Sequence, residues 1–354
     1  MNHRPTGITS RGLVARQASS FHPEHASSFN PEPTATGAQH GALACIAVAV
    51  GSGLNDDVNE VIHQAKIAMK NILIQLDTDP LPSTFDRVVA VDAGADELLS
   101  YGGVTPENAE SLVHGAIFTR KPSDLMHTAI FVGGSNVAAG EALYKKVLKT
   151  LFGPFSVSVM MDSNGSNTTA AATVLAAAKH LDLSQTTAVV LAGTGPVGCR
   201  VAQLLLGQGA TVRLASRSLE KSRATCDMLA KVTNAAKLTP CESASPEGMA
   251  AATSGVQLVV AAGAAGIQLI LADQLAAIST LKLAIDLNAV APAGIAGVEV
   301  MDKAKDRDGL VCYGAVGVGG NKMKIHHACI RRLFESNDQR LDTTAIFELG
   351  RSLG

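Results

Sequence analysis

One stretch near the middle of this 354-residue chain limits the fold more than any other. It reads "TTAVVLAGTGPVGCRVAQLLLGQGATVRLASRS", a short apolar run followed by a glycine-rich turn and a helix-like apolar pattern. Gly193, Gly195 and Gly198 form G-x-G-x-x-G at the junction. In this strand–turn–helix context the pattern predicts a Rossmann unit that binds a dinucleotide. The predicted pyrophosphate contacts are Gly193, Thr194, Gly195, Pro196, Val197 and Gly198.

The strand after the motif lacks the acidic residue that usually binds the ribose 2′-hydroxyl of NAD. Ser216 and Arg217 stand at its end, and Lys221 follows one turn later. A guanidinium here complements a 2′-phosphate through charge-assisted hydrogen bonds, so the sequence predicts NADP, with NAD as the other candidate. The alternative is that Arg217 and Lys221 belong to the solvated start of a helix.

Two further segments stand at the ends of predicted strands of the same unit, where the nicotinamide ring is expected. They are "VVAAGAAG" at 259–266 and "AIDLNAVAP" at 284–292. Small side chains would let the ring approach the backbone, which makes Ala262, Gly263 and Asn288 candidate cofactor residues. The alternative is that both segments are tight turns.

From Met69 onward, apolar runs alternate with Ala-rich helical patterns, which predicts an α/β fold with mostly parallel sheets. The first predicted set of strands covers 72–76, 116–119, 129–132 and 157–161, with helices at 84–91, 106–113 and 137–150. The second set covers 188–191, 211–214, 258–261, 283–286 and 311–313. We therefore expect two α/β domains, with the Rossmann domain at 166–318 and a substrate domain at 69–165. A helix capped by Ser166 or Asn167 is expected to join them.

Residues 1–68 differ from the rest in composition. They contain "RQASSFHPEHASSFNPEPTATG", which has neither helical nor strand periodicity, so a disordered extension is predicted. We expect the function to survive its removal.

Charge and composition argue against several classes of partner. The net charge of -2 and the 3% aromatic content disfavour nucleic acid and anionic membranes. The six cysteines include no CxxC pair, so neither zinc nor a disulfide framework is indicated, and a cytoplasmic location is expected. The longest apolar stretch, 255–272, is interrupted by glutamines and does not predict a membrane span.

Small and polar residues stand at the predicted strand ends of the first unit, where ligands of open α/β sheets bind. Gly133, Gly134 and Asn167 are candidate substrate contacts. Asp86 in "PSTFD" is a further candidate, although Ser83 and Asp86 also spell a helix capping box.

The segment "GGNKMKIHHACIRRLF" at 319–334 places Lys322 and His326 on one helix face, because they are four residues apart. His326, His327 and Cys329 provide too few ligands on one side for a metal. The alternative to a catalytic face is a solvated basic face.

Several blocks in this order, "QLDTDPLPSTFD", "YGGVTPENA", "AIFVGG", "MDSNGSNTTAAA", "VVLAGTGPVG" and "GAVGVGGNKMKIHHACIRRLFES", resemble the NAD(P)-dependent methylene-tetrahydromethanopterin dehydrogenases. The resemblance covers Met69 to the C-terminus. It implies hydride transfer from methylene-tetrahydromethanopterin to NADP or NAD, giving the methenyl form, in one-carbon metabolism. It also implies a deep cleft between two domains, helices in 319–354 that complete the domain at 69–165, and a homo-oligomer.

The candidate active-site residues of that family fall on Asp86, Lys322 and His326 here. Two other functions stay open. One is an enzyme of the same reaction type that acts on methylene-tetrahydrofolate. The other is a binding protein that senses NADP without turnover.

Overall fold

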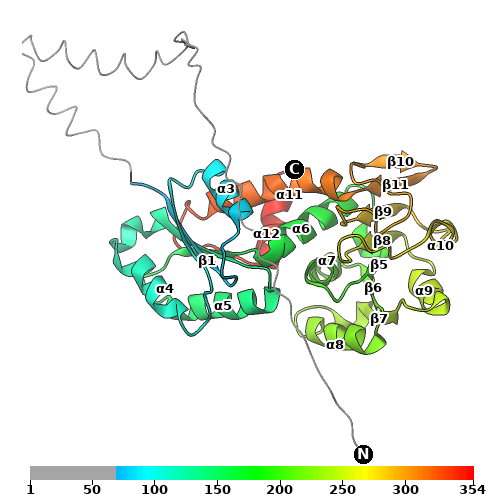
Figure 1. The fold of residues 1–354 in the computed structure, drawn as a ribbon, viewed down its shortest axis with the longest axis horizontal. Helices are drawn as coiled ribbons and strands as arrows, with labels where there is room; N and C mark the ends of the chain where they lie inside the picture. The colour runs from blue at the N-terminus through cyan, green and yellow to red at the C-terminus, as the bar shows by residue number, and fades with distance from the viewer. Residues whose placement is uncertain (1–68) are drawn as a thin grey trace, which may run out of the picture. The chain divides into compact units, whose positions relative to one another are not determined.

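The computed structural model describes residues 69–354, which form one compact unit. Figure 1 shows this unit as strands and helices in alternation. The predicted disordered extension at 1–68 lies outside the described residues.

The first part of the unit is built on a five-stranded sheet. Its strands follow the order β12-β4-β3-β1-β2, and all four neighbouring pairs are parallel. The strands are β1 (Ile72–Asp77), β2 (Glu97–Tyr101), β3 (Thr128–Gly133), β4 (Ser158–Met161) and β12 (Arg340–Leu341). Three α-helices connect them: α3 (Thr84–Asp92), α4 (Ala109–Phe118) and α5 (Val137–Thr150). The inner strands β3 and β4 are buried throughout, as expected when helices cover a parallel sheet.

The second part is built on a seven-stranded sheet of order β10-β11-β9-β8-β5-β6-β7. Its strands are β5 (Thr187–Leu191), β6 (Thr211–Ser216), β7 (Leu238–Glu242), β8 (Leu258–Ala261), β9 (Leu283–Asp286), β10 (Lys305–Arg307) and β11 (Leu310–Tyr313). Its helices are α7 (Pro196–Gly207), α8 (Leu219–Leu229), α9 (Pro246–Thr253) and α10 (Ala272–Ala276). The chain runs from β5 to β7 in one direction and from β8 onward in the other. Ligands of such sheets bind beyond the strand ends at this reversal.

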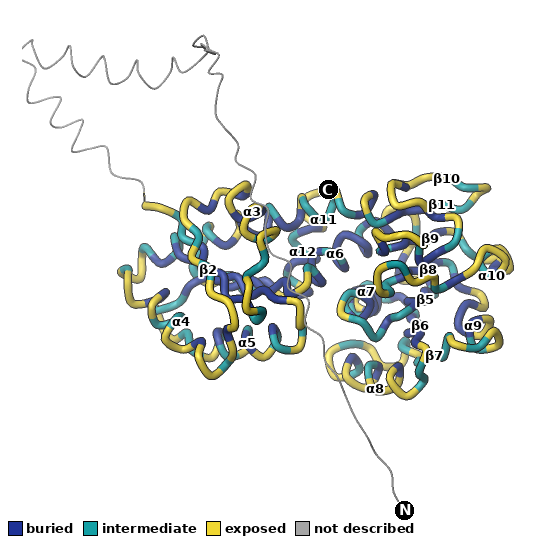
Figure 2. The backbone as a smooth tube through the Cα atoms, in the orientation of Figure 1, coloured by how far each residue is buried: buried dark blue, intermediate teal, exposed yellow. Residues whose placement is uncertain are grey.

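Three helices connect the two sheets. They are α6 (Ser166–Ala178), α11 (Ala315–Arg332) and α12 (Thr343–Ser352). Helix α6 packs against α7, α11 and α12. One hydrophobic core runs through this region, because it includes Phe131 of β3, Ala171 of α6, Val190 of β5 and Phe347 of α12. In Figure 2 the buried stretches follow the central strands and α6, and exposed residues lie on the outer helices.

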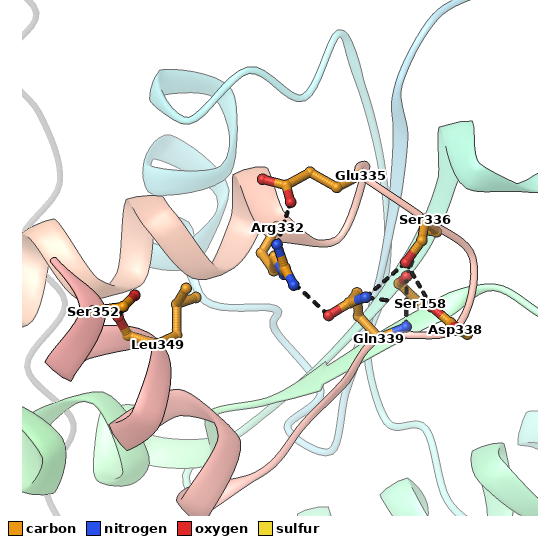
Figure 3. A network of polar contacts seen from close by, with 8 residues as sticks. All are labelled: Ser158, Arg332, Glu335, Ser336, Asp338, Gln339, Leu349 and Ser352. Carbon is orange, nitrogen blue, oxygen red and sulfur yellow. Dashed lines mark hydrogen bonds and ion pairs between the residues drawn. The ribbon is translucent and has the colours of Figure 1, made fainter.

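A polar network ties the segment after α11 to the first sheet (Figure 3). Ser158 Oγ donates to the carbonyl of Ser336 at 2.8 Å, and the backbone N–H of Gln339 donates to Ser158 Oγ at 3.2 Å. The Gln339 amide also reaches Ser336 Oγ and accepts from Arg332 Nε. The chain therefore leaves the second sheet through α11 and adds β12 to the edge of the first.

The predicted fold class is confirmed as mixed α/β with two sheets, but several details of the prediction were wrong. Residues 116–119 are not a strand, because they form the last turn of α4 and the following cap. A four-residue apolar run fits a buried helix turn as well as a strand. Strands β2, β7, β10 and β12 were not predicted. The cleft and the domain boundaries stay predictions.

The predicted cap of α6 was also wrong. Neither Ser166 nor Asn167 caps this helix; instead Asp162 Oδ1 accepts from the backbone N–H groups of Asn167 and Thr168. A carboxylate at the end of β4 has therefore taken the role expected of a residue next to the helix.

Within the described part of the chain, we find no helix that is long and apolar enough to span a bilayer.

Candidate active site

A cavity of about 370 Å³ lies at the carboxyl ends of the strands of the first sheet. Loops after β1, β3 and β4, the first turn of α3 and one side of α6 and α11 form its wall. The lining residues are Asp79, Leu81, Ser83, Phe85, Asp86, Gly134, Ser135, Asn164, Gly165, Thr169 and Lys322. Two of the three predicted catalytic residues, Asp86 and Lys322, thus share one cavity although they are far apart in sequence.

Asp86 stands in the first turn of α3, and the helix start explains its position. Ser83 Oγ accepts from the N–H of Asp86 at 3.2 Å, which caps the helix. The N–H of Ser83, however, donates to Asp77 Oδ2 at 3.1 Å. The predicted capping box is therefore only half formed, since its reciprocal bond goes to Asp77. Burial raises the pKa of Asp86, and Ser83 and Lys322 oppose that shift.

Lys322 carries its ammonium group into the same cavity. The Nζ atom lies 4.2 Å from the centroid of the Phe85 ring, in the range of a cation–π contact. It also lies 3.5 Å from Nδ1 of His326. Burial lowers the pKa of Lys322, while the carboxylates of Asp162 and Asp86 raise it. The alternative of a solvated basic face does not describe Lys322, which is half-buried in the cavity wall.

His326 has no exposed surface. Its ring stacks on Phe131 with centroids 5.8 Å apart and planes 19° apart. Burial, followed by the charge of Lys322 and by His327, lowers the pKa of His326 to about 3, so the ring is neutral. Because Nδ1 faces an ammonium donor, the proton belongs on Nε2. That Nε2 atom is buried and has no hydrogen-bond partner among residues 69–354.

Of the two glycines predicted to contact substrate, Gly133 is the last residue of β3 and Gly134 follows it. Gly134 lines the cavity and has φ +105°, a conformation that disfavours any side chain. A Cβ atom there would lie 2.0 Å from Thr78 Oγ1. A Cβ on Gly133 would lie 3.1 Å from Asp77 Oδ2. Gly134 therefore needs to be glycine, whereas a side chain at Gly133 would require the Asp77 carboxylate to shift by a few tenths of an ångström.

Asn167 does not line the cavity wall described above. It is buried, its Nδ2 donates to the carbonyl of Met161 at 2.6 Å, and its Oδ1 accepts from Thr343 Oγ1 at 2.8 Å. These bonds join β4, α6 and α12. The predicted contact between Asn167 and substrate stays a prediction, and its observed contacts are structural.

The glycine motif forms the turn between β5 and α7, as its spacing predicted. A Cβ on Gly193 would lie 2.7 Å from Leu214 Cδ1, and one on Gly198 would lie 2.7 Å from the Cα of Gly193. At Gly195 the nearest atom would be 3.5 Å away. The outer glycines thus allow strand and helix to pack, and the middle one leaves its surface open. Gly193, Thr194 and Gly195 lie in the turn, and Pro196, Val197 and Gly198 form the first turn of α7.

The N-terminus of α7 suits an anion, because Gly195 is its cap residue and makes no side-chain cap. The first N–H groups of any helix lack partners inside the helix, and its dipole favours negative charge there. Arg217 and Lys221 are exposed beyond the end of β6 and form no ion pair within residues 69–354. Ser216 is buried at the end of β6, and the two residues that follow it, Arg217 and Ser218, carry no carboxylate. These residues fit NADP.

The residues predicted to meet the nicotinamide lie in two loops of the second sheet. A Cβ on Gly195 would lie 3.7 Å from the carbonyl oxygen of Ala262, so this loop borders the motif. Gly263 packs on Leu269, which would lie 2.9 Å from an added Cβ. The Asn288 side chain joins the two loops, because Nδ2 donates to the carbonyl of Pro292 and Oδ1 accepts from the N–H groups of Val290 and Gly266. A contact between Asn288 and the nicotinamide stays a prediction.

Comparison with known proteins identifies the family. A family model described as methylene-tetrahydromethanopterin dehydrogenase, N-terminal, matches residues 84–164. The "Bifunctional protein MdtA" of Methylorubrum extorquens is 45% identical over 286 residues, 80% of this chain and 99% of the relative. The "NAD(P)-dependent methylenetetrahydromethanopterin dehydrogenase" of the same organism is 31% identical over 264 residues, 72% of this chain and 89% of the relative. The chain belongs to the methylene-tetrahydromethanopterin dehydrogenase family.

Among solved structures, quinate dehydrogenase from Corynebacterium glutamicum in complex with NAD covers 80% of this chain and all of its own. It has a TM-score of 0.44 and 12% identity, values at which we draw nothing from it about function.

For this family member, the predicted residues Asp86, Lys322 and His326 come together, and Gly134 lies with the first two in the cavity wall. Phe85 and Thr169 also line the cavity and were not predicted. An apolar residue in the first turn of an amphipathic helix and a threonine inside another carry no sequence signal of a site. In the described part of the chain, no three side chains of the metal-binding types stand close enough to hold an ion.

Proposed function

We propose that this protein oxidises methylene-tetrahydromethanopterin to the methenyl form and passes the hydride to NADP, with NAD as the second acceptor. The observation that carries the proposal is the cavity where a carboxylate, an ammonium and a phenyl ring meet at the strand ends of the first sheet. Family membership supports the same reaction, since a relative with that name is 31% identical.

The proposed substrate site uses the cavity residues by their chemistry. The Phe85 ring is 52% exposed, so it offers an apolar face to a flat pterin. Asp86 stabilises the positive charge that develops as hydride leaves, and Lys322 orients the pterin. His326 positions Lys322 by accepting a hydrogen bond from its ammonium at Nδ1. Gly133, Gly134 and Asn167 keep the strand ends in the shape that this arrangement needs.

The proposed nucleotide site lies at the start of α7. The N–H groups of the motif turn bind the pyrophosphate, and Arg217 and Lys221 bind the 2′-phosphate. Ala262 and Gly263 line the path of the nicotinamide, which supplies the hydride acceptor when it is bound. The substrate domain is assigned to 69–165 with 319–354, the Rossmann domain to 166–318, and a cleft between them brings the two ligands together.

The chemistry suits residues that orient rather than residues that transfer protons. The reacting carbon lies between two nitrogens, and loss of hydride leaves a delocalised amidinium. No general base is required. The residues must hold the donor carbon about 3 to 3.5 Å from the acceptor and keep water from the product.

A second candidate substrate is methylene-tetrahydrofolate. Both carriers present the same reacting carbon, so the described side chains do not separate them.

We also propose a homo-oligomer in the cytoplasm. Val88 and Val91 are each more than half exposed and lie three residues apart on one side of α3. Leu99 and Tyr101 are exposed on β2, which is an edge strand of the first sheet. Apolar side chains gathered at an open edge are typical of an interface between subunits.

A spectrophotometric assay tests the proposed function. Purified protein is given each methylene carrier with NADP and then with NAD, and formation of reduced nicotinamide is followed. We expect turnover with methylene-tetrahydromethanopterin and a higher kcat/KM with NADP. Binding of NADPH without carrier-dependent turnover would instead support a sensing protein.

A further inference from the structure

Asp162 is a buried carboxylate next to the proposed substrate site, and the proposed reaction gives it no role. It has no exposed surface and stands at the end of β4. It accepts three hydrogen bonds, from the N–H groups of Asn167 and Thr168 at 2.9 and 3.1 Å and from Thr168 Oγ1 at 2.6 Å. These bonds cap α6. A neutral Asn would cap the helix equally well, so capping alone does not account for a buried acid.

The turn that follows Asp162 carries the ammonium of Lys322. Gly165 donates its N–H to the carbonyl of Asp162 at 2.8 Å. A Cβ added to Gly165 would lie 3.7 Å from both Nζ and Cε of Lys322. The carboxylates of Asp162 and Asp86 both raise the pKa of Lys322. Burial raises the pKa of Asp162 itself to about 7, and both Thr168 and Lys322 oppose the rise.

Few other charged groups near Lys322 could balance the charge of its ammonium. Asp86 on α3 faces the cavity and so stands where substrate is proposed to bind. Asp79 lines the same cavity, but both its oxygens accept hydrogen bonds from Ser135. On α11 itself, His326 is neutral, and the Cys329 thiol is uncharged because burial and Asp162 raise its pKa. Asp162 is thus the carboxylate near Lys322 that is enclosed by protein.

We propose that Asp162 is a positioning residue, a buried counter-ion that keeps Lys322 charged and held over the turn at Gly165. This inference rests on the proposed function for its catalytic meaning. Asp162 has no surface for substrate to touch, so it acts through Lys322. It leaves Asp86 free to interact with the developing cation instead of serving as the only partner of the ammonium.

The test replaces Asp162 by Asn, which keeps the shape and the cap but removes the charge. Lysines of the protein are reductively methylated with ¹³C, and the signal of Lys322 is assigned by its loss in Lys322→Gln. We expect the pKa of Lys322 to fall by about one unit in Asp162→Asn. Thr168→Ser keeps the hydroxyl donor and should leave the pKa of Lys322 where it is. NADP affinity should stay within about twofold in both variants, because the nucleotide motif is untouched.

The pH profile gives the catalytic readout. Since Lys322 would lose its proton at lower pH in Asp162→Asn, the alkaline limb of kcat/KM for the pterin should move to lower pH. A folded Asp162→Asn protein with an unchanged Lys322 pKa would overturn the proposal and leave Asp162 as a helix cap. An inactive wild-type protein would remove the proposed function, yet the NMR titration would still decide the coupling.

If Asp162→Asn does not fold, Thr168→Val takes its place. Loss of the Oγ1 donor destabilises the ionised form of Asp162, so the pKa of Lys322 should shift in the same direction by a smaller amount. No shift in Thr168→Val would overturn the proposal.

Discussion

The two proposed ligand sites of this protein are built in different ways. The nucleotide site is made of six consecutive residues, the end of a turn and the start of α7, in which two glycines allow close packing and one leaves its surface open. The pterin cavity is lined by side chains from α3, α6 and α11, and burial shifts the pKa values of its ionisable groups Asp86 and Lys322. A backbone site depends on local chain geometry, whereas a side-chain site depends on how distant elements pack. Substitutions should therefore affect the two sites through different mechanisms.

The largest expected effect separates chemistry from nucleotide binding. Lys322→Ala should lower kcat by about 10² to 10³, the range seen when a preorganised charged group is lost from an active site. The Kd for NADP, measured by fluorescence titration, should change by less than about twofold. Lys324→Ala is the matched control, because Lys324 is exposed on the same helix and does not line this cavity. Equal loss of kcat in both variants would show that the helix, and not the ammonium, matters.

The next effect acts on the backbone site. Gly198→Ala places a Cβ 2.7 Å from the backbone of Gly193, so strand and helix must move apart. We expect the free energy of unfolding to fall by about 1 to 3 kcal/mol. We expect the KM for NADP to rise by about tenfold or more, with little change in pterin affinity. Gly207→Ala is the control in the same helix, because no atom lies within 4 Å of the added methyl. A similar KM for NADP in both variants would mean that the close approach at Gly198 is not required.

A smaller effect tests nucleotide choice. Arg217→Ala should raise the KM for NADP by about tenfold, because it removes the free energy of about one charge-assisted hydrogen bond to the 2′-phosphate. The KM for NAD, which lacks this phosphate, should stay nearly unchanged. Arg223→Ala, an exposed arginine further along α8, serves as control. A parallel rise for both nucleotides in Arg217→Ala would contradict a role at the 2′-phosphate.

The smallest effect concerns stability at the side-chain site. The unfolded chain protonates His326 near pH 6.5, but the folded protein does not until about pH 3, because burial has lowered the pKa. The unfolded state thus binds more protons between these values, and stability contributed by His326 is lost as pH falls below 6.5. His326→Gln should remove this pH dependence. In the wild type it lowers the free energy of unfolding by about 1 kcal/mol between pH ~7 and a pH about one unit below the usual pKa of histidine.

Urea unfolding of both proteins at two pH values measures this difference. Asp162, whose pKa is raised to about 7, has the opposite dependence: stability is lost as pH rises from about 3.8 to 7. Because Asp162 is present in both proteins, its contribution cancels in the comparison. Identical pH dependence of wild type and His326→Gln would mean that His326 is not held neutral.

The amino-acid sequence by itself determined the α/β class, the strand–turn–helix of the glycine motif and the capping Ser83. These features depend on residues within a few positions of one another, so local patterns suffice. The pairing of Lys322 with His326 was also accessible, because helical spacing places them on one face. The error at 116–119 shows the limit of such patterns, since a short apolar run does not distinguish a strand from a helix turn.

Only the tertiary structure decided what surrounds those residues. It brought Asp86, Gly165 and Lys322 to one cavity, turned Asn167 inward as a structural link, and made Asp162 the cap of α6. It also fixed the protonation of His326, because a pKa depends on burial and on charges that approach from other elements. Proximity between distant segments and exclusion of water arise from packing, and no local pattern in the chain encodes either one.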